Sequence, residues 1–184
     1  FKNGIKAWSL NCAVTDNKKF KENSFVNFYL SPGNIGASSL YSEHGKNYSA
    51  TPQILEQVPT STIDKCINFC NVNPNSIYLL KMDIEGGEFS ALQGAKSIFG
   101  KVPILIEYKA KSEQAVFLSE QAVFLIDLLK KEYKLYSFDS QLNLCAFDPK
   151  KSYSSVLCIP ILENENYLKL YEERYPLRKK LLSK

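Results

Sequence analysis

The amino-acid sequence predicts an α/β fold, in which helices flank an open sheet whose strands are joined by parallel crossovers. Three observations lead to this fold class. The chain has 184 residues, of which 45% are hydrophobic, enough for one domain with a buried core. Strand-like and helix-like segments alternate along the chain, and this order is typical of parallel sheets. A charged fraction of 23% and an aromatic fraction of 12% exclude wholesale disorder.

The first third of the chain contains two predicted strands and a long loop. Residues 5–14 (IKAWSLNCAV) form a mostly apolar run that ends at the turn-forming residues 15–17, so we expect a largely buried strand there. Residues 25–30 (FVNFYL) are a second strand candidate. Residues 31–49 are rich in Gly, Ser and Asn without a sustained period, which predicts a long loop.

An acidic turn separates a predicted strand from a predicted helix in the middle of the chain. Residues 76–82 (SIYLLKM) form a short apolar strand candidate, which residues 83–88 (DIEGGE) interrupt. The spacing of apolar residues predicts a helix over 88–99, with Gly100 where a C-cap glycine belongs. The apolar face of this helix comprises Phe89, Leu92, Ala95 and Phe99. Residues 102–108 (VPILIEY) are expected to form another buried strand.

A repeated heptad lies within a long helix predicted over residues 111–132. The sequence SEQAVFL occupies 112–118 and again 119–125. Seven residues are nearly two helical turns, so the second copy keeps the apolar face of the first with a phase slip of ~20° and lengthens the helix by ~10 Å. One repeat is shorter than the three to four heptads of a coiled coil, so we expect one helix with a tandem duplication. Two last strands are predicted over 133–138 and 154–159.

Hydropathy and the first residue limit the class of protein further. A helix that spans a bilayer needs ~20 apolar residues. The longest run without a polar side chain is only 156–162, and Pro160 interrupts it, so no transmembrane segment is predicted. The chain begins with Phe1, and no charged-then-apolar leader follows. We therefore expect a fragment or a chain whose true start has been removed.

The net charge of +4 is concentrated at the C-terminus. Residues 171–184 carry five basic and two acidic side chains, and the rest of the chain is nearly neutral. A nucleic-acid-binding surface would need basic and aromatic residues interleaved across the fold. No nucleic-acid partner is therefore expected, and residues 171–184 are interpreted as a solvated basic tail.

The cysteine and histidine content argues against a structural metal. The five cysteines are odd in number and scattered, which favours free thiols in a reducing compartment, so the cytoplasm is the default expectation. Cys66 and Cys70 would supply only two of the four ligands of a tetrahedral zinc, and His44 is the only histidine. No metal site is predicted, and a single histidine also argues against a Ser-His-Asp triad.

Acidic residues gather where ligands bind in an open α/β sheet, outside the carboxyl ends of the strands. Asp83 and Glu85 follow one predicted strand, Glu88 opens the next helix, and Glu107 closes the following strand. Glu85 and Glu88 are also explained by the positive end of a helix dipole, which is worth ~0.3–1 kcal/mol for each carboxylate. Spacing alone does not separate that interpretation from a functional site. Glu107 favours the site slightly, because an unpaired carboxylate is costly in so apolar a strand.

A family resemblance is carried by residues 80–95, LKMDIEGGEFSALQGA. This run resembles the signature of the FkbM-like methyltransferases, which use S-adenosylmethionine. The positions that match the family pattern are Lys81, Asp83, Glu85, Gly86, Glu88, Leu92, Gly94 and Ala95. Four flanking pieces occur in the family's order, at 11–16, 38–40, 62–64 and 103–107. The resemblance spans roughly residues 5–110 and fits less tightly to 160.

The resemblance implies an open Rossmann-like methyltransferase sheet, mostly parallel with an antiparallel C-terminal strand. It implies that this chain lacks the first strands of that sheet, which hold much of the cofactor. Residues 1–170 would then be a partial methyltransferase domain, followed by the basic tail 171–184. The reaction implied is O-methylation of a hydroxyl on a small molecule or sugar.

The same resemblance implies roles for individual residues. Ala13, Val14 and Asp16 would bind S-adenosylmethionine along its adenine. Asp83, Glu85 and Glu107 would be the catalytic carboxylates around the reacting centre. Glu88 and Ser39 would line the acceptor pocket. Two other function classes stay open: a Mg²⁺-dependent hydrolase or phosphotransferase that uses the same carboxylates, and a non-catalytic interaction domain.

Overall fold

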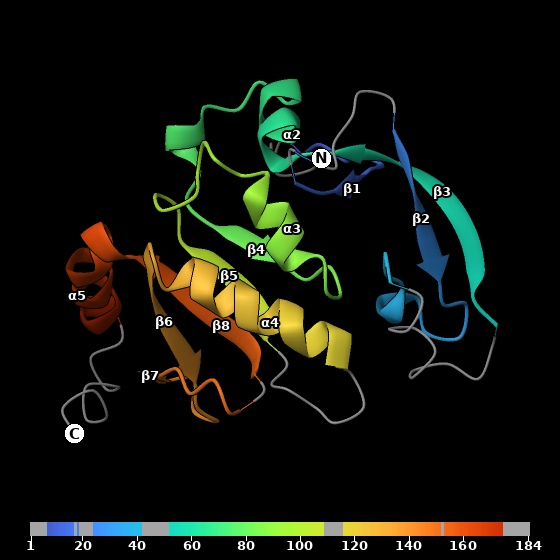
Figure 1. Cartoon of the computed structure of the whole chain (residues 1–184). Coiled ribbons are helices and arrows are strands. Elements are labelled where there is room, and N and C mark those ends of the chain that lie inside the picture. The colour runs from blue at the N-terminus through green and yellow to red at the C-terminus, as the bar shows by residue number, and fades with distance from the viewer. Residues whose placement is uncertain are drawn as a thin grey trace. The chain divides into compact units, whose positions relative to one another are not determined.

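The computed structural model describes residues 7–16, 18, 24–41, 52–108, 116–151 and 153–174 (Figure 1). The chain divides into two compact units that interleave in sequence. The first unit comprises residues 1–76 and 85–97, and the second comprises residues 77–84 and 98–184. The chain therefore leaves the second unit after Ile84 and returns to it at Ile98.

The first unit is built on a three-stranded mixed sheet with the order β1-β3-β2. Its strands are β1 (Ala13–Val14), β2 (Phe25–Leu30) and β3 (Ile54–Ser61). β2 and β3 form a long antiparallel ribbon, visible as the curved pair of arrows in Figure 1. β1 is parallel to the end of β3, where Ala13 pairs with Thr60 and Val14 with Ser61.

Two short helices complete the first unit, with 3-10 turns at η1 (Ile35–Ala37) and η2 (Pro74–Ser76). Helix α2 (Ile63–Phe69) begins where the Thr62 hydroxyl accepts the Lys65 amide at 3.1 Å, an ordinary N-cap. Helix α3 (Glu88–Gln93) ends at Gly94. A Cβ on Gly94 would lie 2.3 Å from the Thr15 carbonyl oxygen, so only glycine permits this approach between α3 and the end of β1.

The second unit is built on a five-stranded sheet with the order β4-β5-β8-β6-β7. Its strands are β4 (Leu80–Met82), β5 (Ile104–Tyr108), β6 (Tyr133–Phe138), β7 (Leu144–Ala146) and β8 (Tyr153–Pro160). Only the β4–β5 pairing is parallel, and the other three pairings are antiparallel. Along β5, Ile104, Ile106 and Tyr108 are buried while Leu105 and Glu107 are half-buried on the opposite face.

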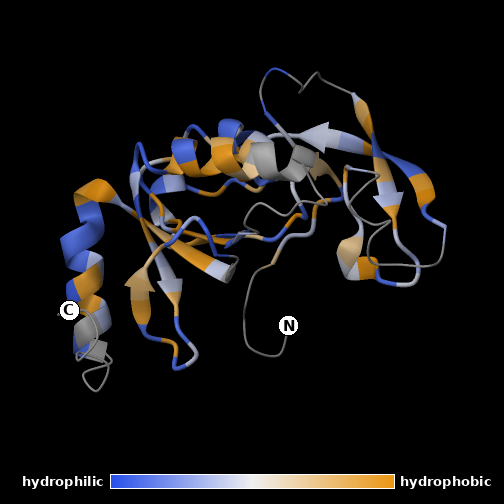
Figure 2. Ribbon diagram, turned by 60° about the horizontal axis from the view of Figure 1, so that its bottom comes forward, coloured by the Kyte–Doolittle hydropathy of each residue, from blue (hydrophilic) through white to orange (hydrophobic). Residues whose placement is uncertain are grey.

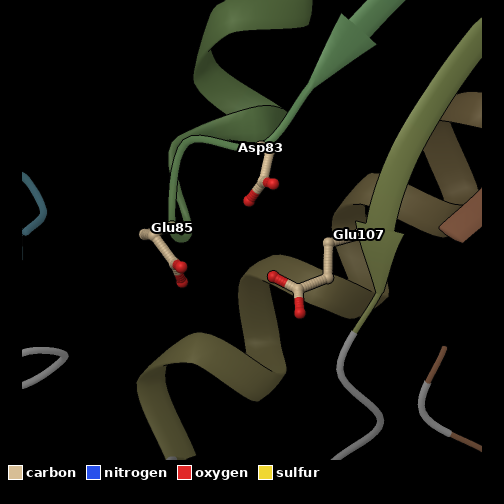
Figure 3. A group of neighbouring side chains, drawn as sticks. All are labelled: Asp83, Glu85 and Glu107. Atoms are coloured by element: carbon tan, nitrogen blue, oxygen red, sulfur yellow. The ribbon is translucent and has the colours of Figure 1, made fainter. Parts of the chain in front are cut away.

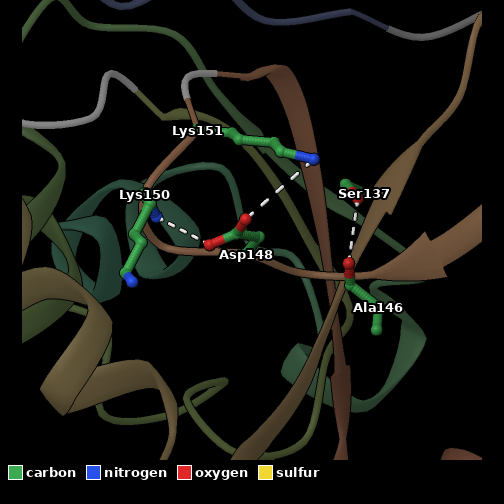
Figure 4. Close-up of polar contacts among 5 residues, drawn as sticks. All are labelled: Ser137, Ala146, Asp148, Lys150 and Lys151. Carbon is green, nitrogen blue, oxygen red and sulfur yellow. Dashed lines mark hydrogen bonds and ion pairs between the residues drawn. The ribbon is translucent and has the colours of Figure 1, made fainter.

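The turn between β7 and β8 is organised by Asp148 (Figure 4). Its carboxylate accepts the Lys150 amide at 2.9 Å and lies 4.0 Å from the Lys151 ammonium group. Beside it, the Ser137 hydroxyl of β6 donates to the Ala146 carbonyl of β7 at 3.4 Å. These contacts are local and polar, as expected of a surface hairpin.

Helix α4 (Val116–Leu129) lies across one face of this sheet (Figure 1). It buries Leu125, Ile126 and Leu129 and exposes Val123 and Phe124. The chain ends in the 3-10 turn η3 (Ile161–Glu163) and α5 (Asn164–Arg174). Hydrophilic and hydrophobic residues alternate along α5, the helix nearest the C label in Figure 2. No helix among the described residues combines the length and the hydropathy needed to cross a membrane.

Tyr133 anchors the start of β6 in the core of the second unit. Its ring is 2% exposed and packs edge-on against Phe99 at a centroid distance of 5.3 Å. Its hydroxyl oxygen accepts the amide of Gly100 at 2.6 Å, and Gly100 adopts φ 77, which glycine tolerates best. Burial raises the pKa of Tyr133 to about 12, because the charged phenolate is poorly solvated there.

Several sequence predictions are confirmed by the structure. Strands over 25–30 and 133–138 coincide with β2 and β6. The strands predicted over 76–82, 102–108 and 154–159 are present as β4, β5 and β8, with β4 beginning only at Leu80. The predicted boundary between residues 170 and 171 falls within α5, and the tail beyond Arg174 lies outside the described residues.

Other predictions are wrong. The sheets are mixed and not mostly parallel, because β8 inserts between β5 and β6 and runs antiparallel to both. Of the strand predicted over 5–14, residues 7–12 are not a strand, β1 covers only Ala13 and Val14, and the part before residue 7 lies outside the described residues. The helix predicted over 88–99 ends at Gln93, since Gly94 is the capping residue and not Gly100.

Some elements were missed, and one prediction falls partly outside the described residues. β3 and α2 were not predicted from the sequence. The duplicated heptad lies within α4 from Val116 onward, but residues 112–115 and His44 are outside the described part of the chain. The structure therefore confirms a helix from Val116 onward. That residues 112–115 belong to the same helix stays a prediction.

Candidate functional site

The acidic turn after β4 has an unusual backbone. Glu85 adopts φ 50 and Gly86 adopts φ 98, so two consecutive residues lie in the left-handed region. A glycine adopts this conformation freely, whereas a glutamate does so at a cost of ~1–2 kcal/mol. Non-glycine residues held in this way cluster at functional sites. The turn is therefore the first local feature that points to a site.

Two side chains predicted for the acceptor pocket hold this turn. Ser39 is 1% exposed, and its hydroxyl donates to the Glu85 carbonyl oxygen at 2.7 Å. Glu88 is 7% exposed, and its carboxylate accepts the Gly86 amide at 3.0 Å. Both contacts are with the backbone, so the structure gives Ser39 and Glu88 a role in shaping the turn.

Asp83 and Glu107 come together at the carboxyl ends of two parallel strands. Met82 of β4 pairs with Ile106 of β5, and the residue after each of these is one of the two carboxylates. A carboxylate oxygen of Asp83 lies within 4.8 Å of one of Glu107. Figure 3 shows the two side chains directed toward each other, with Glu85 two residues beyond Asp83. The parallel pairing of β4 and β5 is thus what creates this pair.

Asp83 also has a cationic neighbour on the same strand. The Lys81 ammonium group lies 3.1 Å from the Asp83 carboxylate, and both side chains are more than half exposed. Pairs exposed to this degree contribute little to stability. The pair leaves Asp83 accessible, while Glu107 is half-buried.

The predicted cofactor residues lie at the end of β1. Ala13 and Val14 are half-buried and paired with β3, and Asp16 is 8% exposed. The Asp16 carboxylate accepts the Lys18 amide at 2.8 Å and the Ser90 hydroxyl at 3.2 Å. Asp16 is therefore fixed to α3 and to its own turn.

Ser90 is a residue that the sequence analysis missed. Its hydroxyl oxygen accepts the Asp16 amide at 3.2 Å and lies 3.1 Å from the Thr15 hydroxyl. A serine hydroxyl has one proton, so when Ser90 donates to Asp16, Thr15 must donate to Ser90. Thr15 is 6% exposed, so the network is largely buried. No sequence pattern marks Ser90, because its role depends on contacts with residues more than seventy positions earlier.

A pair of cysteines lies beside the same strand. The sulfur atoms of Cys12 and Cys66 are 3.9 Å apart, and the Cys66 thiol also contacts the Ser61 hydroxyl at 3.5 Å. Burial, with the neighbouring Cys66 as a second cause, raises the pKa of Cys12 to about 11. Cys12 is therefore a protonated thiol at neutral pH. All five cysteines are free, as the sequence predicts.

The structure thus groups the eight predicted site residues by unit. Ala13, Val14, Asp16, Ser39, Glu85 and Glu88 belong to the first unit, and Asp83 and Glu107 belong to the second. Carboxylates placed like Asp83 and Glu107 can accept a proton from a hydroxyl group or orient it. Oxygen atoms at such spacing are also ligands that Mg²⁺ accepts. Geometry alone supports both chemistries.

One comparison with known proteins bears on these two chemistries. A family model described as the methyltransferase FkbM domain matches residues 2–138, about three quarters of the chain. The matched segment contains all eight predicted site residues. No curated protein and no solved structure matches the chain.

Proposed function

This chain belongs to the FkbM methyltransferase domain family, and on that premise we propose that it methylates a hydroxyl group of a small molecule or sugar with S-adenosylmethionine. The observation that carries the proposal is the pairing of Asp83 with Glu107, which places two carboxylates of the matched segment together at the strand ends. The family match supports methyltransferase chemistry in general, and we add the hydroxyl acceptor as a proposal.

The chemistry of the residues at the end of β1 fits the cofactor. S-adenosylmethionine, when bound, supplies an activated methyl group on a positively charged sulfur, together with ammonium and hydroxyl donors. Asp16 is acidic, buried and already oriented by Ser90 and the Lys18 amide, so it suits a polar donor of the cofactor. Ala13 and Val14 offer half-buried, small apolar surface beside it, as expected along a flat ring. We assign these three residues to the cofactor.

The remaining carboxylates serve the acceptor in this proposal. Methyl transfer is a displacement in which the protein mainly aligns the reactants. Asp83 accepts the proton of the attacking hydroxyl group at a carboxylate oxygen, and Glu107 accepts a hydrogen bond from a neighbouring hydroxyl group of the acceptor. The family resemblance implies a catalytic role for Glu85 as well, whose backbone lies in the left-handed region.

The experiment is transfer of isotopically labelled methyl groups from S-adenosylmethionine to a panel of hexoses and glycerol by the full chain. We expect Asp83→Asn to lower the transfer rate by ~10²–10⁴-fold, the usual contribution of a general base. Asp127→Asn is the matched control, since Asp127 is an exposed aspartate on α4 with no assigned role. Equal rates for the two variants would contradict the role given to Asp83.

A second candidate function rests on the same pair of carboxylates. Oxygen ligands within 4.8 Å of each other favour a hard cation, so Asp83 and Glu107 would hold Mg²⁺ in a hydrolase or phosphotransferase. Titration of the chain with Mg²⁺ tests it. Saturable Mg²⁺ binding that is lost in Asp83→Asn, without any methyl transfer, would favour this alternative over methylation.

A further inference from the structure

We propose that Ser39 is a positioning residue, which holds the Glu85–Gly86 peptide group in its left-handed turn and so fixes the direction of the Glu85 carboxylate. The role of that carboxylate at the acceptor rests on the proposed function. We call the hydrogen bonds of Ser39 and Glu88 to the Glu85–Gly86 peptide group the clamp. Its effect on the backbone conformation is measurable without any substrate.

Four hydrogen bonds of Ser39, two of its backbone and two of its hydroxyl group, set the direction of the hydroxyl. Ser39 is anchored to β2, because its amide donates to the Tyr29 carbonyl at 3.1 Å and its carbonyl accepts the Tyr29 amide at 2.8 Å. The hydroxyl oxygen accepts the Tyr41 amide at 3.2 Å. Its single proton is then donated to Glu85 at 2.7 Å. At 1% exposure, this hydroxyl has little access to a competing water.

The same peptide group is held from its other end. The carbonyl that accepts from Ser39 belongs to Glu85, and the amide of that peptide bond belongs to Gly86. This amide donates to the Glu88 carboxylate at 3.0 Å. Two buried side chains therefore fix the plane of one peptide group, which determines ψ of Glu85 and φ of Gly86.

The clamp restricts ψ of Glu85, one of the two backbone dihedrals of this residue. At φ 50 the backbone of Glu85 adopts the left-handed conformation, which is unfavourable for a residue with a Cβ. The next residue is a glycine at φ 98, which has no Cβ and adopts such a conformation freely. Without the clamp, the 85–86 peptide group could rotate and change ψ of Glu85 and φ of Gly86, and a further rotation about φ of Glu85 would let this residue leave the left-handed region. The carboxylate would then point elsewhere, although the fold would persist.

Ser31 provides a matched control. It is also a buried serine of the first unit, at 0% exposure, but its hydroxyl has no hydrogen-bond partner among the described residues. Ser31→Ala and Ser39→Ala therefore remove the same atom from equally buried places. Only the second substitution removes a contact with the turn.

The direct test is hydrogen exchange of the Gly86 amide, measured by NMR on the full chain without cofactor. We expect Ser39→Ala to speed this exchange by ~10-fold or more, because the peptide group is released, while Ser31→Ala leaves it unchanged. Unchanged Gly86 exchange in Ser39→Ala would overturn the proposal.

Thermal unfolding supplies a second, independent test. Glu85→Gly is expected to melt ~2–4 °C above Glu85→Ala, because both lack the carboxylate but only glycine is free of strain. The Tm loss caused by Ser39→Ala should be smaller when residue 85 is already glycine. If Ser39→Ala lowers Tm equally with glutamate and with glycine at position 85, Ser39 stabilises the fold without holding the turn, and the clamp is contradicted.

The methyl-transfer assay separates the clamp from the proposed function. If both hold, Ser39→Ala and Glu85→Ala lower the rate and the double substitution lowers it no further than Glu85→Ala. Wild-type chain that transfers no methyl group would refute the proposed function, while the exchange and melting results would still decide whether the clamp exists.

Discussion

Gly94 offers the sharpest test of how the first unit is assembled. The substitution Gly94→Ala adds a Cβ that would lie 2.3 Å from the Thr15 carbonyl oxygen and 3.0 Å from the Thr62 Cβ. An ordinary contact needs about 3.4 Å or more, so the backbone must move by about 1 Å. The Thr15 backbone cannot yield easily, because its amide is bound to the Ser61 carbonyl of β3 at 2.9 Å.

The magnitude follows from overpacking. Forcing such a shift costs ~1–3 kcal/mol, which for a chain of this size lowers Tm by ~2–12 °C. Gly36→Ala is the control, because its added Cβ would meet only the Asn34 side chain at 3.5 Å. Thermal unfolding followed by far-ultraviolet circular dichroism measures both variants. If Gly94→Ala melts with the wild type or with Gly36→Ala, the close approach of α3 to β1 is wrong.

Three further predictions concern Tyr133, the pair of Cys12 and Cys66, and Ser90. Tyr133 keeps a neutral phenol up to about pH 12 when folded and ionises near pH 10 when unfolded, so its contribution to stability is complete below pH 10 and is lost as the pH rises through 12. Urea unfolding of Tyr133→Phe should show a shallower loss of stability over that range, and an unchanged slope would contradict the prediction. Mild oxidation with diamide should join Cys12 to Cys66 before any other pair, since their sulfur atoms are 3.9 Å apart; non-reducing peptide mapping that finds other pairs first would count against it. Ser90→Ala should lower the free energy of unfolding by ~1–3 kcal/mol, because it leaves the buried Asp16 carboxylate without that donor; an unchanged urea midpoint would show that the network is dispensable.

The sequence predicted those parts of the fold that depend on local pattern. Strand β6 could be predicted because an apolar–polar alternation is typical of a strand with one buried face. The structure confirms it over Tyr133–Phe138. The pairing of Asp83 with Glu107 follows from two apolar strands that each end in a carboxylate, which parallel neighbours bring together. The match of the family model to residues 2–138 agrees with the resemblance that the acidic turn carries.

What the sequence did not predict depends on contacts between distant segments. β3 has exposed, polar residues and a proline, so no apolar alternation marks it, and its pairing with β2 is what makes it a strand. Helix α3 ends at Gly94, where a side chain would meet the carbonyl oxygen of the distant residue Thr15. The hydrogen bond from the Ser39 hydroxyl to the Glu85 carbonyl oxygen joins residues 46 positions apart, and the place of Ser39 in the acceptor pocket stays a prediction. The position of β8 between β5 and β6 is likewise a property of the assembled sheet.

The most direct test of the central claim is equilibrium dialysis of S-adenosylmethionine against the full chain. The account predicts saturable binding that is weakened by Asp16→Ala and unaffected by Asp127→Asn, because Asp16 is assigned to the cofactor and Asp127 lies exposed on α4. Asp16→Ala must first show a cooperative melt, so that lost binding reports the carboxylate and not unfolding. Binding of equal strength in the wild type and in folded Asp16→Ala would contradict the assigned cofactor site. No saturable binding by the wild-type chain would contradict the methyltransferase function itself.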